Sequence, residues 1–467
     1  MSEQVSQYLA GQREAILDRL LALLRLPSVS TDPAYAGGMA AARDFLCDRL
    51  RALGLGDVQL LDGGGQPAIY ASWLGAPGRP TIIVYGHYDV QPPDPLKLWH
   101  SPPFEPSIRD ERIYARGASD VKGSTLIAVE TIGAFLAVEG GCPVNIKLFL
   151  EGEEEVGSPS LPVIIEKHRD LLAADAMLSA DGGRASTSFP SVSIGCRGIT
   201  ALQFSLRTAA KDAHSGRVGG AVRNALHEMA KLVASLHDEQ GRIQVAGFLD
   251  GAMDVTQDIR AEAAALPFDE ADWYAELGAA PFGDPDYTVR ERTTVRPTVE
   301  VNGMWGGYTG AGGKTVLPCE AHAKLTMRLV PGQEPAAAQE AVRRHLEAQC
   351  LAGVALEFHY RPGGTRAFVL GAQHPLLLAA ERVTEWIHGR RPVRTRAGGT
   401  VPITTLFHES LGIDSLMFGL AMPDEDAHAP NEFFRLASLD EGLRSWPLLL
   451  TELGALAPED FPKHRRD

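Results

Sequence analysis

The first 195 residues alternate between strand-like and helix-like apolar patterns, and this alternation limits the possible folds strongly. Four segments are typical of strands: AIYASWLG, TIIVYGH, VNIKLFLEG and AMLSADGG. Between and before them, residues 39–53 and the segment KGSTLIAVETIGAFLAVEG are typical of helices. Strands that alternate with helices build a largely parallel sheet covered by helices. We therefore predict an α/β fold whose ligands bind beyond the carboxyl ends of the strands.

From about residue 197 the pattern changes to that of a different kind of domain. The successive segments are ITALQFSLRT, RNALHEMAKLVASLHDE, TVEVNG, EAHAKLTMRLV, EPAAAQEAVRRHLEAQ and GVALEFHYRP. Their order is β-α-β-β-α-β, interrupted by a stretch at 240–295 that we interpret as a loop-rich insertion. Helical and buried-strand patterns return after about residue 374. We therefore predict one domain formed by 1–196 and 374–467, with an α+β domain at 197–373 inserted into it.

Charge and cysteine usage exclude several classes of function. The formal net charge is −15, from 44 basic and 59 acidic residues, so neither nucleic acid nor an anionic membrane is expected as the main partner. The sequence contains no run of 18 apolar residues, so no membrane span is predicted. The N-terminal segment is typical of an amphipathic helix rather than a signal peptide. The five cysteines are scattered without a CxxC motif, which indicates a reducing compartment and predicts a cytoplasmic protein.

Acids and histidines follow several of the predicted strands and carry the chemistry. His87 and Asp89, in TIIVYGHYDVQPP, are two residues apart, so in an extended chain they point to the same face. Further candidates are Asp120 in YARGASDVKG, the acids of LFLEGEEEVGS, Asp181 in MLSADGG and His428 in DEDAHAPNE. Each alone has a simpler explanation, since an Asp before a helix is commonly a cap and a Glu run is commonly a solvated loop. Together, at one edge of a sheet, they predict a metal site.

The motifs also resemble those of a known family. Eight of them occur in the family's order between residues 85 and 432: GHYDVQP, ARGASDVKG, EGEEEVGS, DAHSGRVGG, GGKTVLP, RLVPGQ, RAGGTVP and DAHAPNE. They are similar to the M20 metallopeptidases, specifically to the carnosinase-like branch of cytosolic dipeptidases. The resemblance implies a zinc-peptidase-like, mixed but largely parallel sheet with helices on both faces. It also implies an inserted lid domain that forms a homodimer.

The resemblance assigns roles to individual residues. It implies that His87 and Asp181 bind one divalent ion, that Glu155 and His428 bind a second, and that Asp120 bridges both. Asp89 is implied to stand behind His87 and fix its tautomer. Glu154 is implied to be the general base, because the VGS that follows EGEEE sets the register, and a cis peptide bond is implied after Asp120.

The donor set limits the identity of the metal. The implied ligands are imidazole nitrogens and carboxylate oxygens without a thiolate, a mixture that suits Zn²⁺, Mn²⁺ or Co²⁺. Zn²⁺ is our first choice. Such ions lower the pKa of bound water to about 7, which makes a nucleophile available at neutral pH.

Further residues are assigned to the substrate and to the oxyanion that forms on it. His214, in KDAHSGRVGG, resembles the family's histidine that reaches the partner subunit's site and donates to the oxyanion; by itself it reads as an exposed turn histidine. Arg328 could hold a substrate carboxylate bidentately. Thr400 and Gly399 lie in a segment similar to the family's substrate loop, and His374 fits a pocket position. The segment NGMWGGYTGAGGKTVLP reads as too glycine-rich for regular structure, although its backbone amides could bind the same carboxylate.

Three functions are compared. The first is a two-metal hydrolase that cleaves dipeptides or very short peptides with metal-activated water. The second is an amidase or deacylase of N-acyl amino acids, of the acetylornithine deacetylase or succinyl-diaminopimelate desuccinylase type, whose bond chemistry is identical. The third is a non-catalytic binding protein on a peptidase fold, which the complete set of implied ligands and base disfavours.

Overall fold

The computed structural model describes residues 2–464 and divides the chain into two compact units. Unit 1 consists of Met1–Ile194, Leu370–Thr395 and Leu406–Asp467, and unit 2 consists of Gly195–Val369 and Arg396–Thr405. The predicted boundaries at 196/197 and 373/374 differ from these by only a few residues. One part of the prediction is wrong: residues 396–405 were assigned to the outer domain, but they fold with the inserted one.

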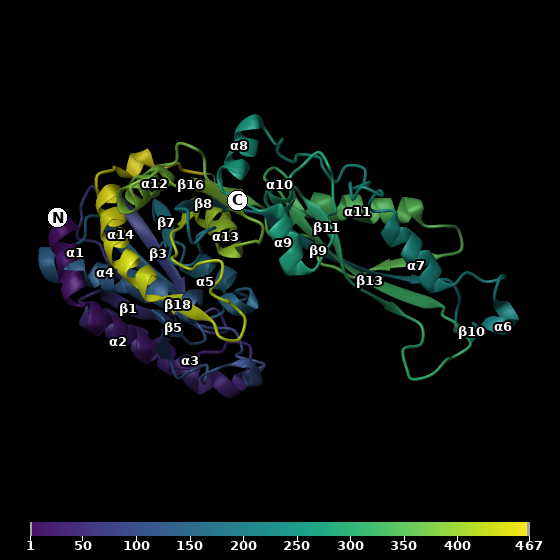
Figure 1. The fold of residues 1–467 in the computed structure, drawn as a ribbon, viewed down its shortest axis with the longest axis horizontal. Coiled ribbons are helices and arrows are strands. Elements are labelled where there is room, and N and C mark those ends of the chain that lie inside the picture. Colours follow the sequence, from purple (N-terminus) through teal and green to yellow (C-terminus); the bar gives the residue numbers. More distant parts are fainter. Residues whose placement is uncertain (1, 465–467) are drawn as a thin grey trace. The chain divides into compact units, whose positions relative to one another are not determined.

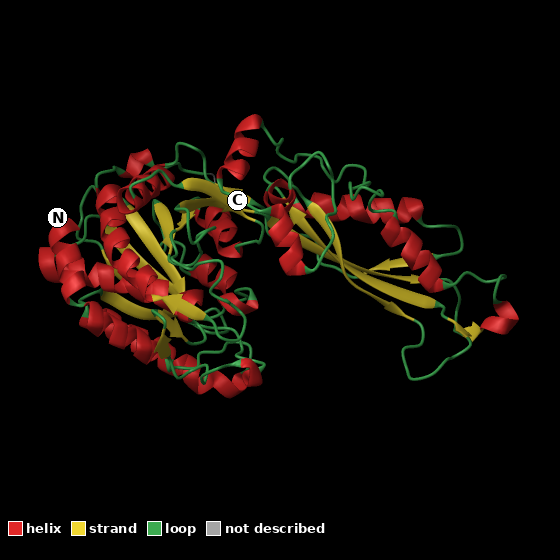
Figure 2. Ribbon diagram, viewed as in Figure 1, coloured by secondary structure: helices red, strands yellow, loops and turns green. Residues whose placement is uncertain are grey.

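Unit 1 is built on a six-stranded mixed sheet in the order β1-β2-β6-β3-β7-β17. Its strands are β1 (Gly56–Leu61), β2 (Ala68–Trp73), β3 (Thr81–His87), β6 (Asn145–Glu151), β7 (Ala176–Ser179) and β17 (Asp414–Met417). The last four strands in the spatial order run parallel, while β2 is antiparallel to both of its neighbours. The predicted α/β class with a mixed, largely parallel sheet is therefore confirmed (Figure 2).

Helices surround this sheet and provide much of its core. They are α1 (Ser2–Gly11), α2 (Arg13–Leu24), α3 (Ala36–Ala52), α4 (Gly123–Glu139), α5 (Leu161–Lys167), α12 (Pro375–His388), α13 (Pro402–Leu411) and α14 (Leu436–Gly454). Phe407 of α13 packs on Tyr85 and Phe149, whereas a Cβ at Gly86 would meet Thr125 of α4 at 2.4 Å. Because successive strand residues face opposite sides of a sheet, α4 and α13 cover opposite faces of β3.

The burial of α4 explains its composition. The segment Ala118–Glu139 is the one helix among residues 2–464 that is long and apolar enough to cross a membrane, and 83% of its apolar window is buried inside the protein. Contacts with the neighbouring helices α1 and α14 cover much of it. An apolar helix that is surrounded in this way is typical of the core of a folded domain.

Smaller strands complete unit 1 and the connecting segments. A three-stranded sheet has the order β18-β5-β4, from Phe433–Arg435, Arg112–Tyr114 and Ser107–Arg109. A second has the order β15-β8-β16, from Phe368–Val369, Ser191–Cys196 and Val393–Ala397. The β18-β5 pair joins the segment that precedes Asp120 to the segment that follows His428.

Unit 2 is a four-stranded antiparallel sheet with helices packed on it (Figure 1). The elements follow the chain as β9 (Gly198–Arg207), α7 (Ala225–Ala234), β11 (Thr298–Gly306), β13 (Glu320–Leu329), α11 (Pro335–Gln349) and β14 (Ala355–Phe358). This is the predicted β-α-β-β-α-β order, with the spatial strand order β11-β13-β9-β14. Side chains of these strands share one apolar core with α7 and α11.

The structure adds detail to two local predictions in unit 2. The stretch at 240–295 is loop-rich, as predicted, but it also contains the short helices α8 (Gln257–Ala265), α9 (Glu270–Leu277) and α10 (Val289–Thr294). Each of these helices begins with a side-chain cap, and α10 has a complete capping box between Thr288 and Glu291. The glycine-rich segment after residue 301 is partly regular, since β11 continues through it to Gly306 with a shift of register at Val301–Gly303.

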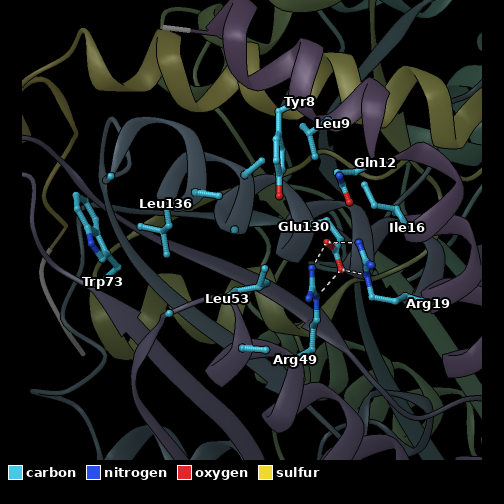
Figure 3. A pocket seen from close by; sticks show the side chains of 16 residues that line it. Tyr8, Leu9, Gln12, Ile16, Arg19, Arg49, Leu53, Trp73, Glu130 and Leu136 are labelled. Carbon is cyan, nitrogen blue, oxygen red and sulfur yellow. Dashed lines mark hydrogen bonds and ion pairs between the residues drawn. The ribbon is translucent and has the colours of Figure 1, made fainter.

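A cavity of about 590 Å³ lies in unit 1 between residues of the N-terminal helices, α3 and α4 (Figure 3). Inside it the buried carboxylate of Glu130 accepts paired hydrogen bonds from Arg19 and Arg49, on opposite sides in the view of Figure 3. None of the predicted site residues lines this cavity. The ion-pair group is therefore a structural link between helices, separate from the predicted chemistry.

Candidate metal centre

The candidate metal centre lies at the carboxyl edge of the main sheet in unit 1. His87 is the last residue of β3 and pairs in register with Glu151, the last residue of β6. Asp181 comes two residues after the end of the neighbouring strand β7. Parallel strands end at a common edge, so the three chain segments deliver their polar side chains to the same place.

The first group of potential ligands contains His87, Asp120 and Asp181, with ligand atoms that all lie within 4.8 Å of one another. His87 Nε2 is 3.2 Å from Asp120 Oδ1. The His87 side chain is fully buried, and its Nε2 atom has no hydrogen bond of good geometry. A buried nitrogen without a proper partner costs free energy, and a cation at this position would satisfy it.

The second group contains Asp120, Glu155 and His428 and is equally compact. His428 Nε2 lies 2.8 Å from Asp120 Oδ2 and 3.2 Å from Glu155 Oε2. Asp120 therefore belongs to both groups, with one carboxylate oxygen directed at each imidazole. The backbone of His428 has φ 63°, an uncommon value for a residue other than glycine, which occurs preferentially at functional sites.

The protonation equilibria indicate a centre that requires positive charge. Burial, reinforced by the negative charges of Asp181 and Glu155, raises the pKa of Glu154 to about 8. Hydrogen bonds to Asp120 and Glu155 raise the pKa of His428 to about 10. Burial opposes a charge on His87, but its hydrogen bonds to carboxylates outweigh burial and hold its pKa well above the ordinary value. Crowded carboxylates raise the pKa of the neighbouring groups and so favour bound protons. The same set of donor atoms can bind divalent cations.

Asp89 positions both His87 and the loop that carries Glu154. The His87 Nδ1 atom is 3.1 Å from the Asp89 carbonyl oxygen and 3.5 Å from its carboxylate. A donor at Nδ1 leaves the Nε2 lone pair directed at Asp120, the tautomer that a metal ligand needs. The Asp89 carboxylate instead accepts hydrogen bonds from the backbone amides of Glu154 and Glu155 and from Ser30.

The structure distinguishes the four acids of the EGEEE segment. Glu151 is buried and accepts a hydrogen bond from the hydroxyl of Tyr85. Glu153 accepts hydrogen bonds from two backbone amides, those of Gln66 and Ser160, and so holds the loop. Of the remaining two, Glu155 belongs to the second ligand group, and the assignment of Glu154 as the general base stays a prediction.

Three residues that support the centre were not predicted as site residues. Glu432 is fully buried and accepts hydrogen bonds from the amides of Gly117, Ser119 and Asp120, and its other partner is Arg116 at 2.6 Å. It fixes the turn before α4, in which the Asp120–Val121 peptide bond is cis. Gln91 donates from both its backbone and its side chain to Glu155. Glu432 closes the quoted DAHAPNE motif, so the signal was present in the sequence.

His214 lies in unit 2, on a two-stranded ribbon formed by β10 (Ala213–His214) and β12 (Val316–Leu317). Its side chain is exposed, and its Nδ1 atom accepts a hydrogen bond from the amide of Gly216. A neutral imidazole that accepts at Nδ1 carries its proton on Nε2. The ring therefore presents an outward-facing donor.

Two of the predicted substrate residues meet inside unit 2. The guanidinium of Arg328, on β13, donates a 2.7 Å hydrogen bond from Nη1 to the hydroxyl of Thr400. Arg197, which was not predicted, shapes the loop before Thr400 by donating to the carbonyl oxygens of Gly398 and Gly399. These contacts are the reason that residues 396–405 fold with the inserted unit. Burial, aided by the charge of Arg328, lowers the pKa of Arg197 to about 10.

His374 has a different environment. It lies in unit 1 at the start of α12, where its Nδ1 atom accepts a hydrogen bond from the amide of Leu376. Its Nε2 atom is 3.2 Å from Asp414 Oδ2, and the side chain is buried. The role of His374 in substrate binding stays a prediction. His408 of α13 contacts the same Asp414.

The fold and the two ligand groups define an α/β protein with an inserted α+β unit and a candidate two-metal centre suited to hydrolysis. The profile of peptidase family M20/M25/M40 matches residues 83–452. The chain belongs to this family, as the sequence predicts.

Individual relatives agree with this assignment. The human Beta-Ala-His dipeptidase is 28% identical over 97% of this chain and 93% of its own length. The Cys-Gly metallodipeptidase DUG1 of Saccharomyces cerevisiae is 26% identical over 94% of this chain and 96% of its own length. Among solved structures, the M20 family metallo-carboxypeptidase Sso-CP2 from Sulfolobus solfataricus has a TM-score of 0.81 and 31% identity, covering 94% of this chain and 99% of that one.

These comparisons confirm three predictions from the sequence: the M20 family, its carnosinase-like branch and a metallopeptidase of the dipeptidase type. They do not favour the N-acyl amino acid alternative, since the relatives named above are dipeptidases. The non-catalytic alternative also loses support, because the predicted metal ligands all gather at one edge of the sheet.

Proposed function

We propose that this metallopeptidase hydrolyses dipeptides and very short peptides with two divalent ions held by His87, Asp120, Asp181, Glu155 and His428. The observation that carries the proposal is the pair of compact ligand groups that share Asp120, with Glu154 in the same electrostatic environment. Two neutral imidazoles and three carboxylates suit two divalent ions, since a shell of this kind is nearly balanced in charge. Zn²⁺ is the first choice, and Mn²⁺ and Co²⁺ are the alternatives.

Glu154 is the proposed general base and acid. Bound divalent ions supply Lewis acidity and lower the pKa of water to about 7. The Glu154 carboxylate takes the proton of the attacking water and returns it to the nitrogen of the leaving amine. Asp89 holds the backbone amide of Glu154, which keeps the carboxylate in place during both transfers.

The inserted unit supplies recognition in this proposal. Arg328 binds the carboxylate at the end of the peptide, and the hydroxyl of Thr400 orients the guanidinium through its 2.7 Å hydrogen bond. Gly399 offers its backbone beside this pair. A free carboxylate requirement would explain a preference for very short peptides, because it restricts cleavage to the end of a chain.

We propose further that unit 2 forms a homodimer and that His214 acts in the partner subunit's site. Strand β11 is an edge strand, and its exposed apolar side chains include Val301, Met304 and Trp305. An edge strand with exposed apolar residues favours pairing with a second copy. The protonated Nε2 of His214 has the character that a donor to an oxyanion requires.

The cysteines support a reducing compartment such as the cytoplasm. All five cysteines are free thiols, and four of them are buried. Burial raises the pKa of the Cys142 thiol to about 12, so this group is protected from oxidation at neutral pH.

A substrate panel tests the reaction. The protein loaded with Zn²⁺, Mn²⁺ or Co²⁺ is assayed on a set of dipeptides and on N-acetyl and N-succinyl amino acids, with release of the free amine as the readout. Turnover of dipeptides is expected, together with loss of activity on dipeptides whose terminal carboxylate is amidated. Activity confined to the N-acyl substrates would remove the dipeptidase proposal.

Mixed dimers test the role of His214. The variants Glu154→Ala and His214→Ala should each be nearly inactive as homodimers. After subunit exchange, a mixed dimer has one intact site, so about one quarter of the wild-type sites should return in an equal mixture. Absence of recovery, with exchange verified by a mass tag, would contradict a donor from the partner subunit.

A further inference from the structure

A second cluster of imidazoles surrounds one carboxylate in unit 1, separate from the candidate metal centre. Asp414 is the first residue of β17, and its Oδ1 lies 2.9 Å from His408 Nδ1. Its Oδ2 lies 2.8 Å from His464 Nε2 and 3.2 Å from His374 Nε2. The rings of His408 and His464 are 4.4 Å apart. Four residues from four chain segments therefore converge on one point.

The cluster lies at the opposite end of the strands from the candidate metal centre. Asp414 pairs with Ala176 at the beginning of β7, whereas Asp181 follows the end of that strand. Five residues at about 3.3 Å each separate Ala176 from Asp181, a distance of about 16 Å along the strand. The cluster shares no residue with the metal ligands, the general base or the Arg328–Thr400 pair, so neither proposal depends on the other; His374 alone also has a predicted role in substrate binding.

The three imidazoles do not play equal roles. His374 accepts a hydrogen bond from the amide of Leu376 at Nδ1, so its proton is on Nε2 and is directed at Asp414. His374 can therefore orient the carboxylate, but its Nε2 atom has no free lone pair with which to bind an ion. His408 Nδ1 and His464 Nε2 face Asp414 from side chains that are about one third exposed.

We propose that His408, Asp414 and His464 form a third metal site, for Zn²⁺ or a similar first-row transition ion. Two imidazole nitrogens and a carboxylate oxygen are a typical donor set for such an ion, and all three ligand atoms lie within 4.8 Å of one another. His374 Nε2 lies 3.2 Å from Asp414 Oδ2 without a hydrogen bond of good geometry, and a slightly closer approach would make it the polar partner that ligating carboxylates usually have. The partial exposure of both histidines leaves room for water as a fourth ligand.

The geometry needs only a small adjustment to accept the ion. Ligands about 2.0–2.1 Å from a tetrahedral ion lie about 3.3 Å from one another. The present separations of 2.9 Å and 2.8 Å from Asp414 to the two nitrogens must therefore increase by about half an ångström. Both histidines are partly exposed, so their side chains can move by this amount without disturbing the core.

Such an ion would attach the C-terminal segment to the sheet. His464 follows α14 and a short turn, Pro458–Asp460, and Lys463 already forms an ion pair with Asp175. The ion would join His464 to His408 and to Asp414, which lies 50 positions earlier in the sequence, and so restrict the end of the chain. Its role would be structural, because the catalytic edge of the sheet is elsewhere.

The number of bound ions tests the proposal. Full-length protein is stripped of metal, equilibrated with Zn²⁺ buffered at low micromolar concentration, desalted and analysed for metal per chain. His408→Gln and His464→Gln should each hold one ion fewer than the wild type. The matched control His227→Gln, an exposed histidine on α7, should hold the same number as the wild type.

Two further measurements distinguish loss of a metal ligand from misfolding of the variants. His464→Cys replaces one zinc ligand with another and should restore the lost ion. Hydrogen exchange of residues 458–464 should be slowed by Zn²⁺ in the wild type and unaffected by Zn²⁺ in His408→Gln, whose substitution lies outside that segment. Equal metal content in the wild type and both glutamine variants would overturn the proposal, and the cluster would then be held by hydrogen bonds alone. This outcome does not depend on whether the two ions of the candidate metal centre are bound.

Discussion

The candidate metal centre of unit 1 and the Arg328–Thr400 pair of unit 2 differ in how firmly their side chains are held. At the metal centre three of the five predicted ligands have a supporting partner: Asp89 for His87, Gln91 for Glu155 and buried Glu432 for the backbone of Asp120. The pair in unit 2 depends on one hydrogen bond between a partly exposed arginine and a loop threonine. Chemistry is placed on a rigid edge, and recognition is left to side chains that can move.

The largest effect is expected from Asp120→Ala, because this carboxylate belongs to both ligand groups. The variant should bind fewer than two ions at the centre and show no measurable turnover. Metal analysis and a dipeptide assay check both points. Asp48→Ala, an exposed acid on α3, is the control and should match the wild type. Full activity in Asp120→Ala would show that the shared carboxylate is not part of the reaction centre.

Glu154→Gln separates catalysis from metal binding. Loss of a positioned general base should lower kcat by about 10²–10⁴-fold while the two ions at the centre stay bound. The neighbouring variant Glu153→Gln is a matched control: it weakens hydrogen bonds to the amides of Gln66 and Ser160, so it should lower the melting temperature and keep most of the activity. If the two variants exchanged these phenotypes, the register of the EGEEE segment would be misassigned.

The sequence was most informative where polar residues follow buried strands. His87, Glu155 and Asp181 could be located because strand ends of a parallel sheet share an edge, and the family motifs then fixed their individual roles. Supporting residues such as Glu432 and Arg197 were missed as site residues. Glu432 lies in the quoted DAHAPNE motif, but the importance of both residues comes from hydrogen bonds to backbone groups of distant segments, which the local sequence does not specify.

The errors in unit 2 have separate causes. Residues 396–405 were assigned by chain continuity, whereas tertiary contacts of Arg197 and Arg328 draw them into the inserted unit. The helices at 257–294 were overlooked because they are short and weakly amphipathic. The capping box of Thr288 and Glu291 was a readable signal for one of them. Short helices are specified more by their caps than by an apolar face.

Arg328→Met tests the Arg328–Thr400 pair of unit 2, the second of the two regions compared. A charge-assisted hydrogen bond contributes about 1.5–3 kcal/mol, so KM for dipeptides should rise by about 10–100-fold while both ions stay bound. Arg207→Met, an exposed arginine on β9, should leave KM unchanged. A fall in kcat at constant KM would instead place Arg328 in the chemical step and weaken the contrast between the two regions.

The smallest effect is expected from Thr400→Val, which removes only the hydroxyl that accepts from Arg328. A neutral partner contributes about 0.5–1.5 kcal/mol, which corresponds to a rise in KM of about 2–10-fold. Because the threonine acts through the arginine, Thr400→Val should add almost nothing in the Arg328→Met background, a coupling that a double-mutant cycle measures. Additive effects of the two substitutions would mean that Thr400 contacts the substrate itself, and unit 2 would then hold two independent recognition residues in place of one oriented guanidinium.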